Sequence, residues 1–239
     1  MRKVGSLVVA AFVISACGGA AVSTPGTAAP SGTVGPPTAT TPASSQPARL
    51  PGEASVVPPG TYTIDPNFGM TIDVPAGWAT CCMGVITKND FAGILYGDIS
   101  NVVVYADSCH WKSGGQSQPQ GATAFAAAFA AQVPRNASAP KAVTVGGMPS
   151  VHVRVTVPAE QDMDANGNFV GCDQGQFISW GSASDPLDGR YHQAPGQIDD
   201  LYLLDIDGRT YVFDVISGPD ISASDKADLE AMLASLKIG

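Results

Sequence analysis

The chain has 239 residues, of which 44% are hydrophobic and 14% charged, and its formal net charge is −9. The acidic balance argues against nucleic acid as a partner, because affinity for nucleic acid comes largely from Lys and Arg side chains that neutralise phosphates. It also argues against electrostatic adhesion to anionic lipid. Beyond the N-terminal segments, about 180 residues remain, enough for one domain with its own core.

Residues 1–16 have the order of features that an export signal requires. Arg2 and Lys3 supply a positive start, and an almost unbroken apolar stretch covers residues 7–14. This stretch is shorter than the roughly 20 apolar residues that a membrane-spanning helix needs. The Ile-Ser-Ala-Cys sequence that ends at Cys17 resembles a bacterial lipobox, which implies that residues 1–16 are removed as a lipoprotein signal peptide and that Cys17 is lipidated. An ordinary cleaved signal with a chance cysteine is the alternative.

The segment that follows is built from Ala, Thr, Pro, Ser and Gly. Arg49 and Glu53 are its only charged side chains up to residue 59. Apolar burial in such a segment cannot offset the entropy of ordering it. We therefore predict that residues 17–59 are the lipidated cysteine and a disordered tether. Residues 60–239 would then form a single extracytoplasmic domain, held on the cell membrane by the lipid alone.

The predicted domain consists of short β-strands punctuated by Gly, Pro, Asn and Asp. Strict alternation in residues 151–157 places four valines on one face of their strand. Asp207-Gly208 favours a type I′ turn between the last two strands, because both central residues of that turn need positive φ. Strands are expected at residues 61–64, 70–74, 83–87, 102–105, 142–145, 151–157, 201–206 and 210–216.

Two stretches carry helical periodicity. The first is expected from about residue 124 to residue 132, with Thr123 as N-cap and Pro134 ending it. The second begins after Ser222, and its apolar stripe consists of Leu229, Met232, Leu233 and Leu236. This order of elements predicts an α+β fold, in which an antiparallel β-sheet is packed by two or three helices that include this C-terminal amphipathic helix.

Four cysteines besides Cys17 lie in the predicted domain: Cys81, Cys82, Cys109 and Cys172. An exported chain leaves the reducing cytosol, and an even number of cysteines indicates disulfides. A bridge between the two adjacent cysteines would close a strained eight-membered ring. We therefore expect two long-range bridges, one from this pair to Cys109 and the other to Cys172. One alternative joins only Cys109 to Cys172, and a zinc, copper or Cys-His site is a weaker one because the chain has no C-x-x-C pair.

The sequence from residue 162 to residue 173 matches a calcium-loop pattern. Its oxygen ligands would be Asp162, Asp164, Asn166, Asn168 and Asp173. A glycine stands at the position where such a loop turns sharply, but aspartate replaces the usual last glutamate, and the preceding segment is predicted as a strand rather than a helix. The alternative is a solvated acidic loop.

A candidate pocket is suggested by His110, Trp111, Trp180, Arg190 and His192, which combine aromatic and polar groups. Partly buried aromatic side chains and polar loop groups are the alternative. Since the chain has no G-x-S-x-G elbow and no glycine-rich phosphate loop, the sequence assigns no catalytic residue.

Two resemblances accompany this reading. The sequences Asp-Ser-Cys-His-Trp at 107–111, Tyr-His-Gln at 191–193 and Asp-Ile-Asp-Gly at 205–208 make the domain resemble an uncharacterised extracytoplasmic domain common in actinobacterial lipoproteins. That resemblance covers most of residues 60–239 and implies no established activity. Val-Pro-Ala-Gly-Trp at 74–78 and the terminal helix are similar to the Mog1, PsbP and LpqN-like group, which implies a mostly non-catalytic binding role.

These features together predict a lipid-anchored, non-catalytic binding or accessory domain on the extracytoplasmic face of the cell membrane. The expected partners are the membrane, through the lipid, and an envelope protein or small ligand. No cofactor is expected, with calcium as the one candidate. The alternative is a cell-envelope hydrolase, supported by calcium, in which His110 or His192 works with nearby carboxylates.

Overall fold

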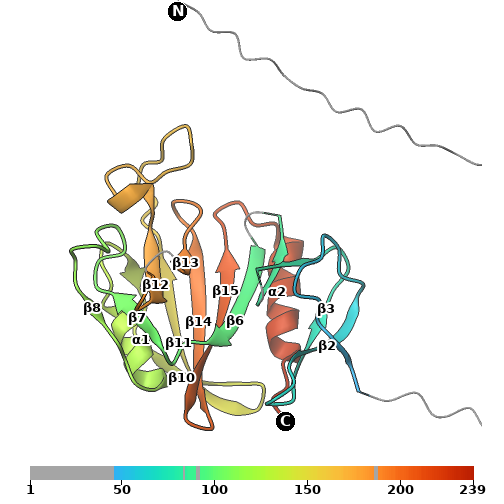
Figure 1. Ribbon diagram of the computed structural model, residues 1–239. Coiled ribbons are helices and arrows are strands. Elements are labelled where there is room, and N and C mark those ends of the chain that lie inside the picture. The colour runs from blue at the N-terminus through green and yellow to red at the C-terminus, as the bar shows by residue number, and fades with distance from the viewer. Residues whose placement is uncertain (1–45, 83, 90–91, 186–187) are drawn as a thin grey trace, which may run out of the picture. The chain divides into compact units, whose positions relative to one another are not determined.

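The computed structural model describes residues 46–82, 84–89, 92–185 and 188–239 (Figure 1). The predicted signal peptide, the predicted lipidation site at Cys17 and the first part of the predicted tether lie outside these residues. None of the described helices is long and apolar enough to cross a membrane.

One large antiparallel sheet and two small sheets make up most of the regular structure. The large sheet contains, in spatial order, β10 (Lys141–Val145), β11 (Met148–Thr156), β14 (Ile198–Ile206), β15 (Arg209–Ser217), β6 (Ala92–Asp98), β5 (Val85–Lys88) and β4 (Ala79–Cys81), while β9 (Asn136–Ala137) pairs with β11. The first small sheet contains β1 (Ala48–Arg49), β2 (Gly60–Asp65) and β3 (Met70–Val74). The second contains β13 (Gly189–Tyr191), β12 (Ile178–Ser182), β7 (Val102–Tyr105) and β8 (Gln116–Ser117). A short 3-10 helix, η1, covers Asp173–Gly175.

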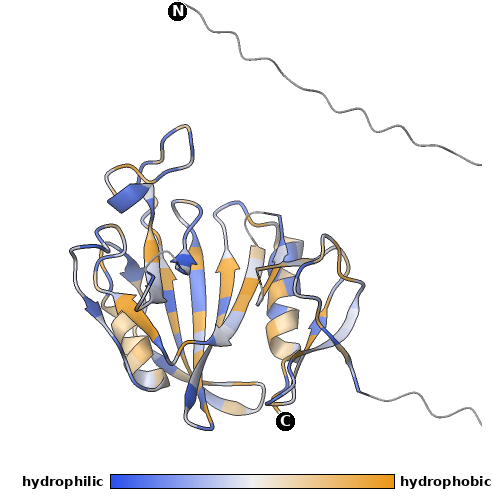
Figure 2. Cartoon of the chain, in the orientation of Figure 1, coloured by the Kyte–Doolittle hydropathy of each residue, from blue (hydrophilic) through white to orange (hydrophobic). Residues whose placement is uncertain are grey.

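The two α-helices pack on opposite faces of the large sheet. Helix α1 (Ala122–Ala130) buries Phe129 in one core cluster with Leu201 of β14. Helix α2 (Ala223–Ser235) buries Met232 in another cluster with Phe213 of β15. Because side chains alternate along a strand, the large sheet contributes to both cores. Strands β7 and β12 extend the α1 layer, and β2 and β3 extend the α2 layer. Figure 2 shows hydrophobic residues concentrated on the central strands and the helices.

The predicted fold class is wrong. Instead of one sheet packed by two or three helices, the described residues form three sheets and two α-helices, and strand predominates over helix. The small sheets cover much of the surface that helices were expected to cover. Their strands include two-residue pieces such as β1 and β8, which are too short to show the period-2 alternation by which strands are recognised in a sequence.

The β14–β15 hairpin forms as the sequence indicates. Its nine-residue strands pair from Ile198↔Ser217 to Ile206↔Arg209. The connecting Asp207 and Gly208 have φ values of 48° and 79°, as a type I′ turn requires.

The N-terminus of α2 is capped as the sequence predicts, whereas that of α1 is not. Ser222 caps α2 by accepting a hydrogen bond from the Asp225 amide. Helix α1 begins before the predicted Thr123 cap, with Gly121 at the N-cap position and no side-chain cap hydrogen bond. The Ala122 amide instead donates to the carboxylate of Asp205, which comes from β14. A distant strand thus supplies the contact that a local cap was expected to make.

The packed part of the chain begins earlier than the predicted boundary at residue 60. The described residues from 46 onward belong to one compact unit, and β1 pairs with β2 in parallel. Leu50 and Val57 are buried in the core beside α2. Only a few apolar residues interrupt the Pro-rich composition of this stretch, but the large sheet and β2 give them a surface to pack on.

Candidate binding groove and the charge network beneath it

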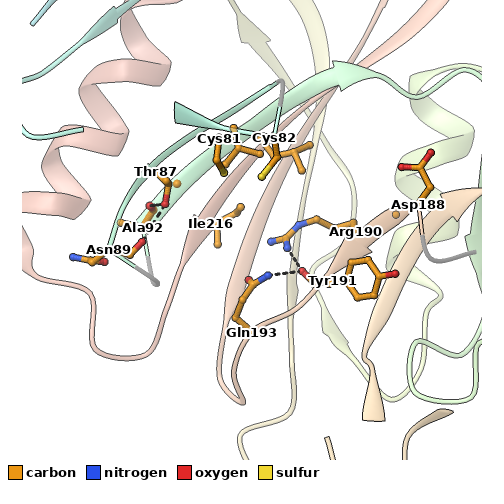
Figure 3. Close-up of a pocket in the computed structure, with 14 residues that line it drawn as sticks. Cys81, Cys82, Thr87, Asn89, Ala92, Asp188, Arg190, Tyr191, Gln193 and Ile216 are labelled. Carbon is orange, nitrogen blue, oxygen red and sulfur yellow. Dashed lines mark hydrogen bonds between the residues drawn. The ribbon is translucent and has the colours of Figure 1, made fainter. Parts of the chain in front are cut away.

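A cleft lies on the face of the large sheet that α1 only partly covers. Helix α1 packs on β11 and β14, while side chains on the same face of β5 and β6, with Ile216 at the end of β15, line the floor of the cleft. Strand β13 forms a wall of the cleft across from this floor (Figure 3). A hollow of about 790 Å³ at one end shares Leu95, Arg190 and other lining residues with a hollow of about 290 Å³ at the other. We call the two together the β6 groove.

Gly97 gives this groove part of its depth. Gly93, Leu95 and Gly97 alternate along β6 and face the same side of the sheet. A Cβ atom added at Gly97 would meet no atom within 4 Å, so the space above this residue is open. Glycine inside a strand often marks a place where a ligand or another backbone comes close.

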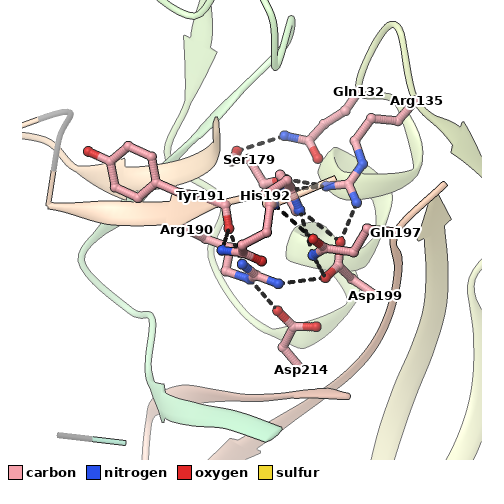
Figure 4. Close-up of polar contacts among 10 residues, drawn as sticks. Gln132, Arg135, Ser179, Arg190, Tyr191, His192, Gln197, Asp199 and Asp214 are labelled. Atoms are coloured by element: carbon pink, nitrogen blue, oxygen red, sulfur yellow. Dashed lines mark hydrogen bonds and ion pairs between the residues drawn. The ribbon is translucent and has the colours of Figure 1, made fainter. Parts of the chain in front are cut away.

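The β13 wall rests on a buried network of charged side chains (Figure 4). Arg190 donates through Nε to Asp214 Oδ2 and through Nη2 to Asp199 Oδ1, both at 2.7 Å. Arg135 donates through Nη2 to Asp199 Oδ2 at 2.6 Å, and Gln197 Nε2 donates to Asp199 Oδ1 at 2.9 Å. These contacts tie the strand that walls the groove to β14 and β15 beneath it.

His192 lies in the middle of this network and is neutral. Its Nδ1 is 3.1 Å from Asp199 Oδ2, and its Nε2 lies 3.0 Å from Arg135 Nη1 and 2.7 Å from Ser179 Oγ. Burial, followed by the charge of Arg135, lowers the pKa of His192 to about 3. Although burial opposes it, contacts from His192, Arg190 and Arg135 hold the pKa of Asp199 well below its ordinary value.

Ser179, His192 and Asp199 have the order of contacts found in a Ser-His-Asp hydrolase triad. The environment is different, because the Ser179 side chain is completely buried and also accepts a hydrogen bond from Arg135 Nη1. A nucleophile must reach a substrate carbonyl, and Ser179 is enclosed with 0% exposure. In this structure the three residues are part of the core.

Asp214 is the least satisfied member of the network. Its Oδ2 accepts from Arg190, but its Oδ1 is buried without a hydrogen-bond partner among the described residues. Burial and the neighbouring Asp199 charge raise the pKa of Asp214 to about 7.

The structure separates the five residues of the candidate pocket. His110 is exposed and pairs with Asp107 at 3.1 Å. Trp111 packs against Tyr105, and Trp180 against Phe129 in the core beside α1. Arg190 and His192 share the buried network, and Trp180 meets Arg190 at the lining of the smaller hollow of the β6 groove.

Two long-range disulfides were expected, and that prediction is wrong. Cys109 bonds to Cys172 across 63 residues, and Cys81 and Cys82 are free, as in the single-bridge alternative. The adjacent pair lies at the end of edge strand β4 and lines the β6 groove. Burial, with a hydrogen bond to Cys82, raises the pKa of the Cys81 thiol to about 11.

Several oxygens of the predicted calcium loop already have protein partners. The Asp164 carboxylate accepts from the amides of Asn166 and Asn168 and from the Asn168 side chain at 2.8–3.0 Å. Asp173 Oδ2 accepts from the Lys112 amide at 2.8 Å. No group of three or more His, Cys, Asp or Glu side chains among the described residues is placed to hold a metal ion. Calcium binding at this loop stays a prediction.

Sequence reasoning missed the acidic residues of the network, although a signal for them is present. Asp199 alternates with Leu201 and Leu203, and Asp214 alternates with Val212 and Ile216. A carboxylate on the apolar face of a strand needs a buried partner. The partners Arg135 and Ser179 come from other elements, and no local pattern connects them to β14.

Comparison with known proteins gives distant structural likeness and no match in sequence. No family model and no curated protein matches the chain. The solution structure of cyanobacterial PsbP (CyanoP) from Synechocystis sp. PCC 6803 is similar, with 13% sequence identity and a TM-score of 0.38 over 78% of this chain and 94% of that one.

Proposed function

We propose that this protein is a lipid-anchored, non-catalytic binding domain of the cell envelope that holds an elongated ligand with an apolar body in the β6 groove. The observation that carries the proposal is the open space above Gly97, which continues past Leu95 into the larger hollow of the groove. At about 3.3 Å per residue, the length of β6 corresponds to roughly 20 Å. The resemblance to actinobacterial envelope lipoproteins supports the location.

The walls of the groove favour recognition through side chains rather than through an added β-strand. Strand β13 is an edge of its sheet, and an unpaired edge can accept a peptide strand. Here the Tyr191 carbonyl already accepts hydrogen bonds from the Arg190 and Gln193 side chains (Figure 3). The apolar part of the floor includes Leu95 and Ile216.

The burial of Ser179 supports binding over hydrolysis. The hydrolase alternative needs a histidine and a carboxylate beside an accessible nucleophile. His192 and Asp199 have such a neighbour in Ser179, but it is fully enclosed, and His110 pairs instead with Asp107 outside this network.

Filling the groove tests the proposal. We expect the parent chain to bind the neutral, environment-sensitive dye Nile red with a rise in fluorescence. Gly97→Leu should weaken this signal while retaining its melting temperature, because the new side chain enters open space in the smaller hollow of the groove. Thr144→Leu, which adds the same side chain on an exposed part of β10, is the control. Equal dye binding by both variants would contradict the groove as the binding site.

The anchor has an independent test. In intact bacterial cells supplied with a labelled fatty acid, the full chain should incorporate the label and sediment with membranes. Cys17→Ser should lose both properties. A label that persists in Cys17→Ser would overturn the predicted lipidation site and leave the groove experiment unaffected.

A further inference from the structure

Two free thiols converge on the β6 groove. Cys81 is the last residue of β4 and lies opposite Val85 of β5, whose side chain lines the groove. The next side chain along a regular strand would point to the other face of the sheet. Cys82 instead has φ 55°, and its side chain lines the same groove (Figure 3).

The left-handed conformation at Cys82 is the unusual feature. Positive φ is uncommon for a residue other than glycine, and asparagine, aspartate and histidine are the usual exceptions. Here it turns the Cys82 side chain into the groove that Cys81 also lines. Cys82 is exposed and Cys81 partly so, so a ligand can reach both sulfurs from solvent.

We propose that Cys81 and Cys82 form a two-sulfur site for a soft, monovalent metal ion of the Cu(I) class. Thiolates select soft ions such as Cu(I), and Cu(I) is stable with two sulfur ligands. A structural zinc site needs four ligands, and the described residues supply no group of three or more His, Cys, Asp or Glu side chains for a metal. The proposal is independent of which ligand occupies the groove.

Binding requires no change of oxidation state. Each thiol releases its proton to solvent, and two sulfur–copper bonds form while copper remains Cu(I). Direct oxidation of the pair would close an eight-membered ring, whose geometry is far from that of an ordinary disulfide. A metal ion inserted between the sulfurs enlarges this ring and avoids that constraint.

The test uses the full chain carrying Cys17→Ser, so that Cys81 and Cys82 are the only unbridged cysteines. Under anaerobic conditions, with ascorbate as reductant, Cu(I) is titrated in competition with the coloured chelator bicinchoninate. We expect the parent to withhold one Cu(I) per chain from the chelator. Cys81→Ser and Cys82→Gly should each lose this equivalent, whereas Thr144→Leu should keep it.

Cys82→Gly separates loss of binding from loss of folding. Glycine adopts positive φ without steric cost, so this variant should melt at or above the temperature of the parent and still fail to bind Cu(I). The proposal is overturned if the parent withholds no Cu(I), or if Cys82→Gly binds it as tightly as the parent does. Peptide mapping without reductant that finds Cys81 joined to Cys82 in the purified chain would overturn it as well.

Discussion

Asp199 and Asp200 are neighbours in β14, yet their carboxylates face opposite sides of the large sheet and different surroundings. Asp199 is buried between Arg135 and Arg190. Asp200 pairs on the other face with Arg154, whose side chain is 52% exposed. A buried pair that loses one partner leaves an uncompensated charge, whereas an exposed pair is screened by water. The two positions therefore form a matched test of how much the network contributes.

Asp199→Asn is expected to lower the free energy of unfolding by about 3–5 kcal/mol, because two buried arginines lose their shared carboxylate. Asp200→Asn should cost about 1–2 kcal/mol, because the Asp200 carboxylate is only 13% exposed while Arg154, the partner that it leaves, is solvated. Urea unfolding followed by circular dichroism measures both. Equal losses at the two positions would show that the buried network is not the source of the difference.

The raised pKa of Asp214 predicts a pH dependence of stability. Between its ordinary value of 3.8 and its folded value of about 7, the folded state holds a proton that the unfolded state has released. The free energy of unfolding contributed by this group therefore falls as pH rises through that window. Asp214→Asn cannot ionise, so its stability relative to the parent should improve between about pH 4.5 and pH 7.5.

Asp200→Asn is the control for this pH series. Hydrogen bonds from His152 and Arg154 hold the pKa of Asp200 below its ordinary value in spite of burial. Its contribution is present above the unfolded pKa and is lost only as pH falls below that value. The difference between parent and Asp200→Asn should thus stay constant across the same window. A constant difference for Asp214→Asn too would mean that Asp214 titrates normally.

At the scale of elements, local sequence predicts a structure well when the stabilising contact is itself local. The Asp207-Gly208 turn and the Ser222 cap depend on neighbouring residues, and both are visible in the sequence. The start of α1 depends on a contact with Asp205 of β14. The formation of β1 depends on its pairing with β2. Such contacts join residues far apart in the chain, and local sequence does not reveal them. The N-cap of the helix was therefore predicted at Thr123 rather than at Gly121, and the domain was predicted to start at residue 60 rather than before β1.

Truncation tests the corrected boundary. A chain that begins at residue 46 should unfold with the stability of the full chain, because it retains every described element. A chain that begins at residue 60 lacks Leu50 and Val57, which are 7% and 0% exposed. Burying each such side chain contributes about 1.5–3 kcal/mol, so the shorter chain should lose roughly 3–6 kcal/mol in urea unfolding.

Leu50→Ala and Val57→Ala in the chain from residue 46 separate the burial of side chains from the loss of β1. Their summed losses should account for most of the effect of the truncation. If the chain from residue 60 is as stable as that from residue 46, residues 46–59 belong functionally to the tether after all.

For the whole molecule, the coverage of the large sheet decides both its stability and the place of its groove. Helix α1 covers one face over β11 and β14, together with the two strands β7 and β12. Helix α2 covers the other face, together with β2 and β3. The floor of the groove is the part of the first face that this arrangement leaves open. The sequence shows glycines at positions 93 and 97, but whether space opens above a glycine of β6 depends on which elements come to lie above that strand. The sequence therefore could not predict the groove.

This uneven coverage predicts a gradient of hydrogen exchange across the molecule. Leu203 and Val212 face each other in the β14–β15 pair, and both side chains are completely buried. Their amides should exchange only when the whole domain unfolds, because opening them requires exposing a core. Asn166 and Gly167 lie at the exposed tip of the acidic loop, and their amides should exchange within the shortest labelling time. Hydrogen–deuterium exchange with peptide-level mass spectrometry measures both regions in one experiment.

Exchange in β5 and β6 should fall between these limits, since one face of each is open to the groove. Protection of β6 equal to that of β14 would mean that something covers the groove in solution.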